Sequence, residues 1–128
     1  MKFLLDTHFI LWLPIGGRGI SRNARALLDS SANEFVFSAA SLWEIALKRA
    51  RYQGTFAFDP REVRRQMLEN GYEELPILGQ HVLQTEALAP IHKDPFDRLL
   101  VAQAMVEGIT LLTVDAMIAR YPGPIRKV

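Results

Sequence analysis

The sequence contains no cysteine among its 128 residues. Disulfide scaffolds and zinc–thiolate centres both need cysteine side chains, so neither can form in this chain. Proteins of a reducing compartment manage without disulfides, and we therefore expect this protein to work in the cytoplasm.

The sequence also lacks any long hydrophobic run. A transmembrane helix needs about 20 consecutive apolar residues, and no stretch comes close to that length. The opening residues MKFLLDTHFILWL look superficially like a signal peptide, but Asp6 and His8 interrupt the apolar segment and no small-residue cleavage site follows. We therefore interpret this segment as part of the folded protein and expect no membrane partner.

The sequence has no large excess of positive or negative residues. Lys and Arg number 15 against 14 for Asp and Glu, which gives a formal net charge of +1. A balanced total neither requires nor excludes a nucleic-acid partner, because such binding depends on local clusters of charge. Hydrophobic residues make up 49% of the chain, which argues against disorder. A chain of this length can bury one sizeable core, so we predict a single domain over residues 1–128.

Short apolar segments alternate with segments of helical periodicity along the chain. Parallel strands are joined through helices that cover both faces of their sheet, so this alternation predicts an α/β fold with a parallel sheet of four to five strands. The strands are expected at residues 2–6, 34–38, 72–78, 109–115 and, as a fifth, 124–128. The helices are expected at residues 7–13, 21–30, 39–54, 59–71, 80–88, 95–107 and 116–121.

Acidic residues lie close to the ends of the predicted strands. Asp6 ends the first strand, Asp115 ends the fourth, and Glu44 lies two turns into the helix that follows the second. Ligands of open α/β sheets bind beyond the carboxyl ends of the strands. We therefore expect these three side chains to share one edge of the sheet.

Asp97 reaches the same edge by a different route. Its helix, residues 95–107, turns at Gly108 and runs into the strand 109–115, so the helix and the strand are antiparallel. The helix is about 20 Å long at ~1.5 Å per residue, and the strand covers a similar length at ~3.3 Å per residue. The start of the helix should therefore lie beside Asp115, which makes four acids from distant parts of the chain converge.

Helix capping offers a simpler explanation for each acid taken separately. Asp94 suits an N-cap, Pro95 the first helical position, and Asp97 the third position, where a negative charge favours the helix dipole. The sequence SLWE fits a capping box that ends at Glu44. Capping does not predict that the acids meet, however, and packing gives no reason for an acid at Asp6, directly after an apolar run.

A cluster of four carboxylates implies a cation. The charges would repel one another and raise their pKa values unless a positive ion compensated them. Ligand sets made only of oxygen favour hard ions such as Mg²⁺ or Mn²⁺ over zinc. Such ions polarise phosphoryl oxygens and activate bound water, so the cluster predicts metal-assisted hydrolysis of a phosphodiester.

A second class of function also gathers acids at a sheet edge. A non-catalytic, phospho-accepting signalling domain would place paired acids after the first strand and a lysine at the end of the last strand. Here a single acid is followed by Thr7 and His8. An interaction module without catalytic activity is a third possibility, which only an assay separates from the other two.

Several other polar residues have an ordinary and a functional interpretation. Thr7 and Thr113 flank the acids and could orient a carboxylate or a metal-bound water, or simply form local hydrogen bonds. We expect His81 and His92 at the surface. The basic residues after Glu44 are interpreted as a solvated helix face or, if they ring the acids, as contacts to RNA phosphates. These basic residues are Lys48, Arg49 and Arg51.

Four segments in order carry a family resemblance. LLDTH, SAASLWEIALK, HKDPFDRLLVAQA and LLTVD resemble the motifs of PIN-domain ribonucleases, specifically the VapC toxins of bacterial toxin–antitoxin pairs. The resemblance spans nearly the whole chain. It implies a PIN-like domain, RNA cleavage that depends on Mg²⁺ or Mn²⁺, a homodimer, and inhibition by a cognate antitoxin bound to a groove around residues 42–70.

The resemblance also assigns roles to individual acids. It implies that the acidic quartet consists of Asp6, Glu44, Asp97 and Asp115. In that pattern Asp97 belongs to the site and Asp94 caps the helix, so the two neighbouring acids have different functions.

Overall fold

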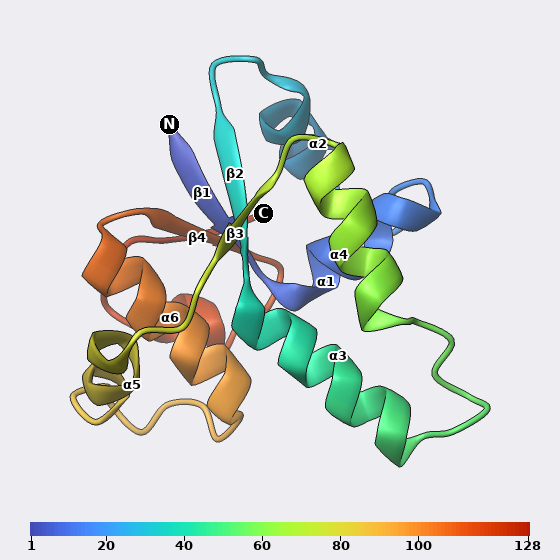
Figure 1. The fold of residues 1–128 in the computed structure, drawn as a ribbon. Helices are drawn as coiled ribbons and strands as arrows, with labels where there is room; N and C mark the ends of the chain where they lie inside the picture. The colour runs from blue at the N-terminus through green and yellow to red at the C-terminus, as the bar shows by residue number, and fades with distance from the viewer.

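A five-stranded parallel sheet forms the centre of the molecule, with strand order β3-β2-β1-β4-β5 (Figure 1). The computed structural model describes residues 1–128. The strands are β1 (Lys2–Leu5), β2 (Glu34–Ser38), β3 (Glu73–Leu75), β4 (Thr110–Thr113) and β5 (Ile125–Lys127). The helices are α1 (Thr7–Trp12), α2 (Arg22–Asp29), α3 (Ala39–Arg51), α4 (Pro60–Glu69), α5 (Gly79–Thr85) and α6 (Pro95–Glu107), with two short 3₁₀ helices, η1 (Leu13–Ile15) and η2 (Ile118–Arg120). The predicted α/β class and parallel sheet are confirmed.

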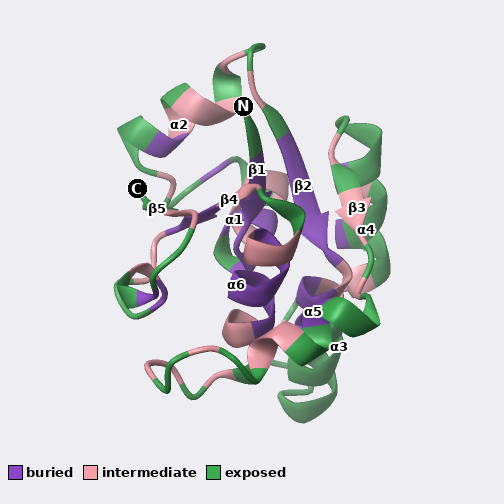
Figure 2. Ribbon diagram, turned by 90° about the vertical axis from the view of Figure 1, so that its left-hand side faces the viewer, coloured by how far each residue is buried: buried purple, intermediate pink, exposed green.

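Alternation along β1 divides the core between the two faces of the sheet. Phe3 and Leu5 point to one face, where they pack with buried side chains of α1, α2, α3 and α4. Leu4 points to the other face, where it packs with buried residues of α6 and η2. Figure 2 shows buried residues of β2 and α6, drawn in purple, near the centre of the molecule. Helices therefore cover both faces, as predicted.

The order of the strands places a switch point between β1 and β4. The chain proceeds from β1 outwards through β2 to β3 and then returns to the other side of β1 for β4 and β5. Leu5 pairs with Phe37 of β2 and with Leu112 of β4, so the next residue, Asp6, stands at the carboxyl edge between the two neighbouring strands. This edge is where open α/β sheets bind their ligands.

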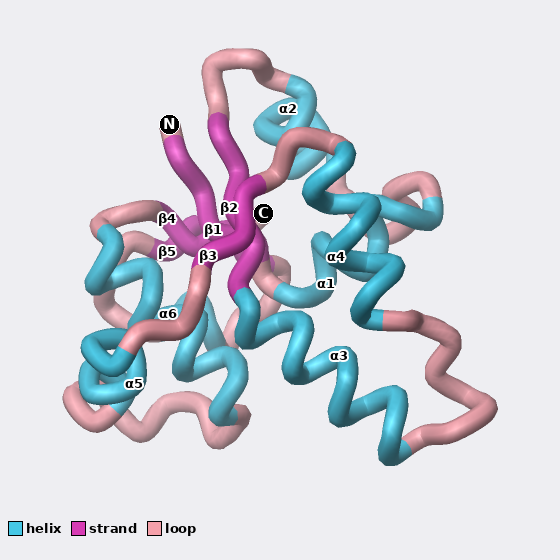
Figure 3. Tube along the Cα trace, viewed as in Figure 1, coloured by secondary structure: helices cyan, strands magenta, loops and turns pink.

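α3 follows β2 without an intervening loop, as Figure 3 shows. Ser38 is the last residue of β2 and also the N-cap, since its hydroxyl accepts a hydrogen bond from the amide of Ala40. The predicted SLWE capping box is therefore wrong, because the helix begins before it and Glu44 lies in the second turn. α3 ends at Arg51 rather than at Gly54.

Other boundaries differ from the predictions by a few residues. The helix that was expected to stop at Pro14 continues as η1, because proline is tolerated in a first helical turn. The expected strand 72–78 pairs only over Glu73–Leu75, and the expected helix 116–121 is the 3₁₀ helix η2. No helix is long and apolar enough to cross a membrane.

Candidate active site

Asp6 is buried at the end of β1 and holds three segments together. Its Oδ1 accepts a hydrogen bond from the amide of His8 and thereby caps α1. Its Oδ2 accepts from the Thr113 hydroxyl at 2.6 Å and from the Val114 amide at 3.1 Å. The His8 ring adds a contact, with Nδ1 3.4 Å from Oδ1. Asp6 thus joins β1, α1 and the end of β4, and it has a capping role that the sequence did not predict.

Glu44 is buried in the second turn of α3, where its carboxylate has two partners. The Thr7 hydroxyl donates a hydrogen bond to Oε1 at 2.7 Å, and the Lys48 ammonium donates to Oε2 at 2.9 Å. Thr7 also lies 2.9 Å from the Ser41 hydroxyl. Because α1 directly follows Asp6 and α3 directly follows β2, the neighbouring strands bring Thr7 and Glu44 together.

Asp94 and Asp97 differ in what their carboxylates contact. Asp94 caps α6, and its Oδ1 accepts from the amides of Phe96 and Asp97 at 2.8 and 3.3 Å. The Asp97 carboxylate caps nothing. It faces His92 instead, with Oδ2 3.0 Å from the ring Nε2. The two acids around Pro95 therefore occupy different environments.

His92 stands between Asp97 and Asp115. The ring Nε2 lies 3.5 Å from Asp115 Oδ2, and one ligand atom from each of the three residues lies within 4.8 Å of the others. Asp115 is anchored through its Oδ1, which accepts from the amides of Met117 and Ile118. α6 and β4 are antiparallel, and the start of α6 does lie beside the end of β4.

One pocket collects most of these groups. It has a volume of about 230 Å³ and is lined by acidic and basic side chains from α1, α3, α6 and the segments that precede α6 and follow β4. Asp6 lies beneath it, buried. The lining includes Glu44, Lys48, His92, Asp94, Asp97 and Asp115.

The charges in the pocket are not balanced. Burial, together with the negative charges of Asp94 and Glu44, raises the pKa of Asp97 to about 7, despite the opposing effect of His92. For Asp115, burial acts to raise the pKa, but the amides of Met117 and Ile118 and the His92 ring outweigh it, so its pKa is lowered.

The acids of the site raise the pKa values of two basic side chains, His8 and Lys48. The hydrogen bond to Asp6 is the main cause of a raised pKa at His8, and burial partly opposes it. Burial acts to lower the pKa of Lys48, but its hydrogen bond to Glu44 and the surrounding acids raise it overall. The pocket is therefore short of positive charge, most of all beside Asp97.

The donor set fits a hard divalent cation. Asp97 and Asp115 offer carboxylate oxygens from two elements, Glu44 offers a third carboxylate on the same pocket, and no thiolate is present. The raised pKa of Asp97 shows that a positive charge beside it would be stabilised.

The expectation that both histidines lie at the surface is wrong for His81, which is buried, and His92 is only partly exposed. His92 belongs to the pocket, with about 20% of its side chain exposed. His81 is fully buried, and its Nε2 lies 2.8 Å from Glu107 Oε2 at the far end of α6. Neither histidine belongs to a recognisable sequence motif. His92 does precede Asp94 and Asp97 in one short segment, and this proximity could have indicated that it belongs to the site.

The three basic residues of α3 separate in the structure. Lys48 lines the acidic pocket and binds Glu44. Arg49 points to the next helix, where it pairs with Asp59, the N-cap of α4, at 3.1 Å. Arg51 lies over the Tyr52 ring, beside the pocket.

The fold and this acidic edge define a class of protein. Residues 3–124 match the PIN domain, so the chain belongs to the PIN-domain family and has the fold of these nucleases. A search of curated proteins finds no match.

Solved structures resemble the fold over almost the whole chain. A VapBC2 complex of Rickettsia felis, bound to a promoter DNA fragment, matches with a TM-score of 0.71 and 15% identity, covering 99% of this chain and 98% of the other. A toxin–antitoxin complex of Klebsiella pneumoniae matches with a TM-score of 0.64 and 18% identity, covering 98% of both chains. The PIN-domain endonuclease Utp24 matches with a TM-score of 0.54 and 15% identity, covering 99% of this chain and 84% of the other.

Proposed function

We propose that this protein is a metal-dependent endoribonuclease that acts as the toxin of a toxin–antitoxin pair. The observation that carries the proposal is the pocket at the carboxyl edge of the sheet, where Asp97, Asp115 and Glu44 meet without enough positive charge to balance them. The PIN-domain fold and its VapBC neighbours support the same conclusion.

Asp97, Asp115, Glu44 and Asp6 would hold Mg²⁺ or Mn²⁺ in this proposal. Such an ion would polarise a phosphoryl oxygen of the substrate and lower the pKa of a bound water. Asp115 offers Oδ2, since its Oδ1 is held by backbone amides. Both oxygens of Asp6 already accept hydrogen bonds. The exposed His8 ring could move away from Oδ1 and make room for the metal, and no backbone hydrogen bond would be broken.

Thr7 and Thr113 act as supporting residues in this proposal. Each hydroxyl fixes one oxygen of an acid, Glu44 for Thr7 and Asp6 for Thr113. A carboxylate held in one rotamer is preorganised for a ligand, because its orientation need not be fixed on binding.

A second hollow, of about 390 Å³, adjoins the acidic pocket and is a suitable path for RNA. It shares Glu44, Lys48 and Asp94 with the pocket, and two further cations, Arg51 and Lys93, line it. Cations beside the acids would hold the phosphates on either side of the cleaved bond.

The neighbours Arg51 and Arg49 provide a matched test of this path. Both are basic residues of α3, but only Arg51 lines the hollow, whereas Arg49 is paired with Asp59. In an inactive background, Arg51→Ala should flatten the salt dependence of binding to single-stranded RNA by roughly one phosphate contact, a slope change of about 0.7. Arg49→Ala should leave the slope unchanged. Equal slopes in the two variants would remove Arg51 from the RNA path.

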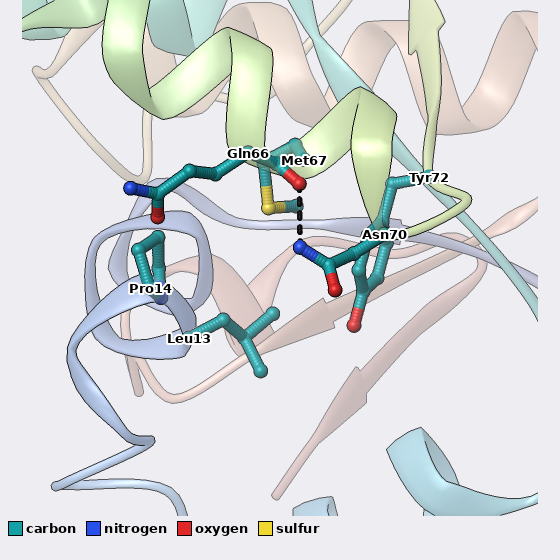
Figure 4. Close-up of a pocket in the computed structure, with 6 residues that line it drawn as sticks. All are labelled: Leu13, Pro14, Gln66, Met67, Asn70 and Tyr72. Atoms are coloured by element: carbon teal, nitrogen blue, oxygen red, sulfur yellow. Dashed lines mark hydrogen bonds between the residues drawn. The ribbon is translucent and has the colours of Figure 1, made fainter.

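An antitoxin would bind to a groove beside α4. A hollow of about 210 Å³ lies there. Figure 4 shows the residues that line it: Leu13 and Pro14 of η1, Gln66 and Met67 of α4, and Asn70 and Tyr72, which follow α4. The hollow lies at the end of the region 42–70 that the resemblance assigns to the antitoxin. An apolar floor with polar amides at its rim suits an inserted peptide segment.

A homodimer also belongs to the proposal. The exposed apolar side chains Leu78, Val82 and Leu83 cluster on and beside α5, outside the acidic pocket, and would be covered by a second copy.

Cleavage of RNA by purified protein tests the proposal. Asp97→Asn should abolish Mg²⁺-dependent cleavage while the fold persists, because it removes one metal charge at nearly constant shape. Asp59→Asn is the matched control, since it alters an acid that starts another helix away from the pocket. Cleavage by Asp97→Asn at the wild-type rate would refute the site. A wild-type protein that neither cleaves RNA nor binds Mg²⁺ would instead indicate a non-catalytic interaction domain.

A further inference from the structure

His92 is the one residue that contacts both Asp97 and Asp115. The two acids come from different elements, the first turn of α6 and the segment after β4, and the ring Nε2 lies 3.0 and 3.5 Å from their Oδ2 atoms. Whether His92 acts as a further metal ligand or as a hydrogen-bond donor depends on which ring nitrogen carries the proton.

The other ring nitrogen settles the protonation. Nδ1 accepts a hydrogen bond from the backbone amide of Asp94 at 3.2 Å. An amide always donates, so Nδ1 must present its lone pair, and in the neutral ring the proton sits on Nε2. The proton at Nε2 therefore faces the two carboxylates. A ring in this tautomer has no lone pair to offer a metal at that position.

The backbone of His92 is also held in place. Its amide donates to the Tyr121 hydroxyl at 2.8 Å, and Tyr121 is buried. The same hydroxyl accepts from Arg98 on α6 at 3.1 Å. The ring is thus fixed from both sides, by Tyr121 through the backbone and by Asp94 through Nδ1, and it cannot move away from the acids without losing these bonds.

We propose that His92 is a positioning residue that holds Asp97 and Asp115 in place through its Nε2–H, and that it is not a metal ligand. This role rests on the proposed nuclease function, because it prepares two of the metal-binding acids. Asp115 Oδ1 is already fixed by backbone amides, so His92 orients Oδ2 of that acid. The carboxylate of Asp97 has no capping role and depends on His92 for its orientation.

The tautomer can be measured in the metal-free protein. Long-range ¹H–¹⁵N spectra of the neutral ring should show His92 protonated at Nε2 alone. His81 serves as an internal reference, because its Nδ1 likewise accepts from a backbone amide, that of Leu78, and its Nε2 faces Glu107. A His92 ring protonated at Nδ1 would overturn the proposal.

Two substitutions test the two ring nitrogens of His92 separately. His92→Gln places an amide donor near the position of Nε2, whereas His92→Asn keeps an acceptor near Nδ1 for the Asp94 amide but cannot reach the acids. The dissociation constant for Mn²⁺, measured by electron paramagnetic resonance, should stay within threefold of wild type for Gln. It should weaken about tenfold or more for Asn, because an acid that loses the hydrogen bond orienting it binds a metal less tightly. Equal Mn²⁺ affinity in wild type and both variants would overturn the proposal, and the melting temperature of each checks its fold.

Bound Mn²⁺ distinguishes a positioning residue from a ligand. Pulsed resonance spectra of the wild-type protein should show no coupling to an imidazole nitrogen, and such a coupling that disappears in His92→Gln would overturn the role given to His92. A wild-type protein that binds no Mn²⁺ would refute the proposed function, while the tautomer measured without metal would still decide the orientation of His92.

Discussion

Two histidine–carboxylate contacts lie at opposite ends of α6, and they differ in the number of acids that face the histidine. At the C-terminal end, His81 faces one acid, Glu107, in a network that includes Gln103 and Ser38. At the N-terminal end, His92 faces two acids, Asp97 and Asp115, with a third carboxylate, Glu44, on the same pocket.

The His81 contact has matching donors and acceptors, whereas the His92 contact has more acids than cations. Every buried polar side-chain atom has a hydrogen-bond partner, and in the His81 network donors and acceptors match. At His92 the acids outnumber the cations, and burial together with the neighbouring carboxylates raises the pKa of Asp97. The comparison shows that a satisfied polar cluster stabilises the fold, whereas an unbalanced one retains the capacity to bind an ion.

Breaking the His81 network should have the largest effect on stability. His81→Ala leaves the buried Leu78 amide without its partner, removes one of the contacts of Gln103 and opens a cavity, so it should cost about 3 kcal/mol of the free energy of unfolding. Urea denaturation measures the loss. Glu107→Gln is the control, since it keeps an acceptor for Nε2–H and should cost under about 1 kcal/mol. A loss below that level in His81→Ala would show that the network contributes little.

Adding metal should stabilise only the unbalanced cluster. Mg²⁺ at about 100 times its dissociation constant should raise the unfolding free energy of wild type by about 2.7 kcal/mol. Calorimetry should find this gain absent in Asp97→Asn and largely retained in Asp94→Ala, which loses an N-cap worth roughly 1 kcal/mol and one charge on the pocket but none of the four acids proposed to hold the metal. Equal gains in all three proteins would mean that Asp97 and Asp115 do not form one metal site.

The pH dependence should reveal the same imbalance without metal. The pKa of Asp97 rises from its ordinary value of 3.8 to about 7, so the folded state binds this proton more tightly than the unfolded state. Its contribution to stability is present at low pH and is lost as the pH rises towards 7. At pH 8, metal-free Asp97→Asn should be more stable than wild type, by on the order of 1–2 kcal/mol. A difference between the two proteins that does not change between pH 4 and 8 would contradict the assigned pKa.

Much of the fold was predictable because its signals are local. Asp59 and Asp94 both precede a proline at the first helical position, and both cap the predicted helices. The approach of Asp97 to Asp115 followed from the lengths of a helix and a strand joined at Gly108, which is a matter of backbone geometry.

The side chains of the site were less predictable because they depend on tertiary contacts. His92 lies in a loop, and its direction is set by Tyr121 and the Asp94 amide, which no spacing rule encodes. The start of α3 at residue 39 was predicted correctly, but the capping box at Ser41 was wrong, because Ser38 and Ser41 are both competent caps and the end of β2 selects the first. The capping role of Asp6 was missed although a helix was predicted from residue 7, because Asp6 was interpreted as the last residue of the strand 2–6 and not as an N-cap.

The hydrogen bond from Thr113 to Asp6 joins residues 107 positions apart, and it has a consequence for the order in which the molecule is made. β1 is synthesised early but lies in the middle of the sheet, and its neighbour β4 leaves the ribosome roughly 5 to 20 s later at about 5–20 residues per second. A nascent chain therefore carries Asp6 and Glu44 long before it carries Asp97 and Asp115. The pocket can form only when synthesis is nearly finished, so incomplete chains lack two of the four acids that are proposed to hold the metal.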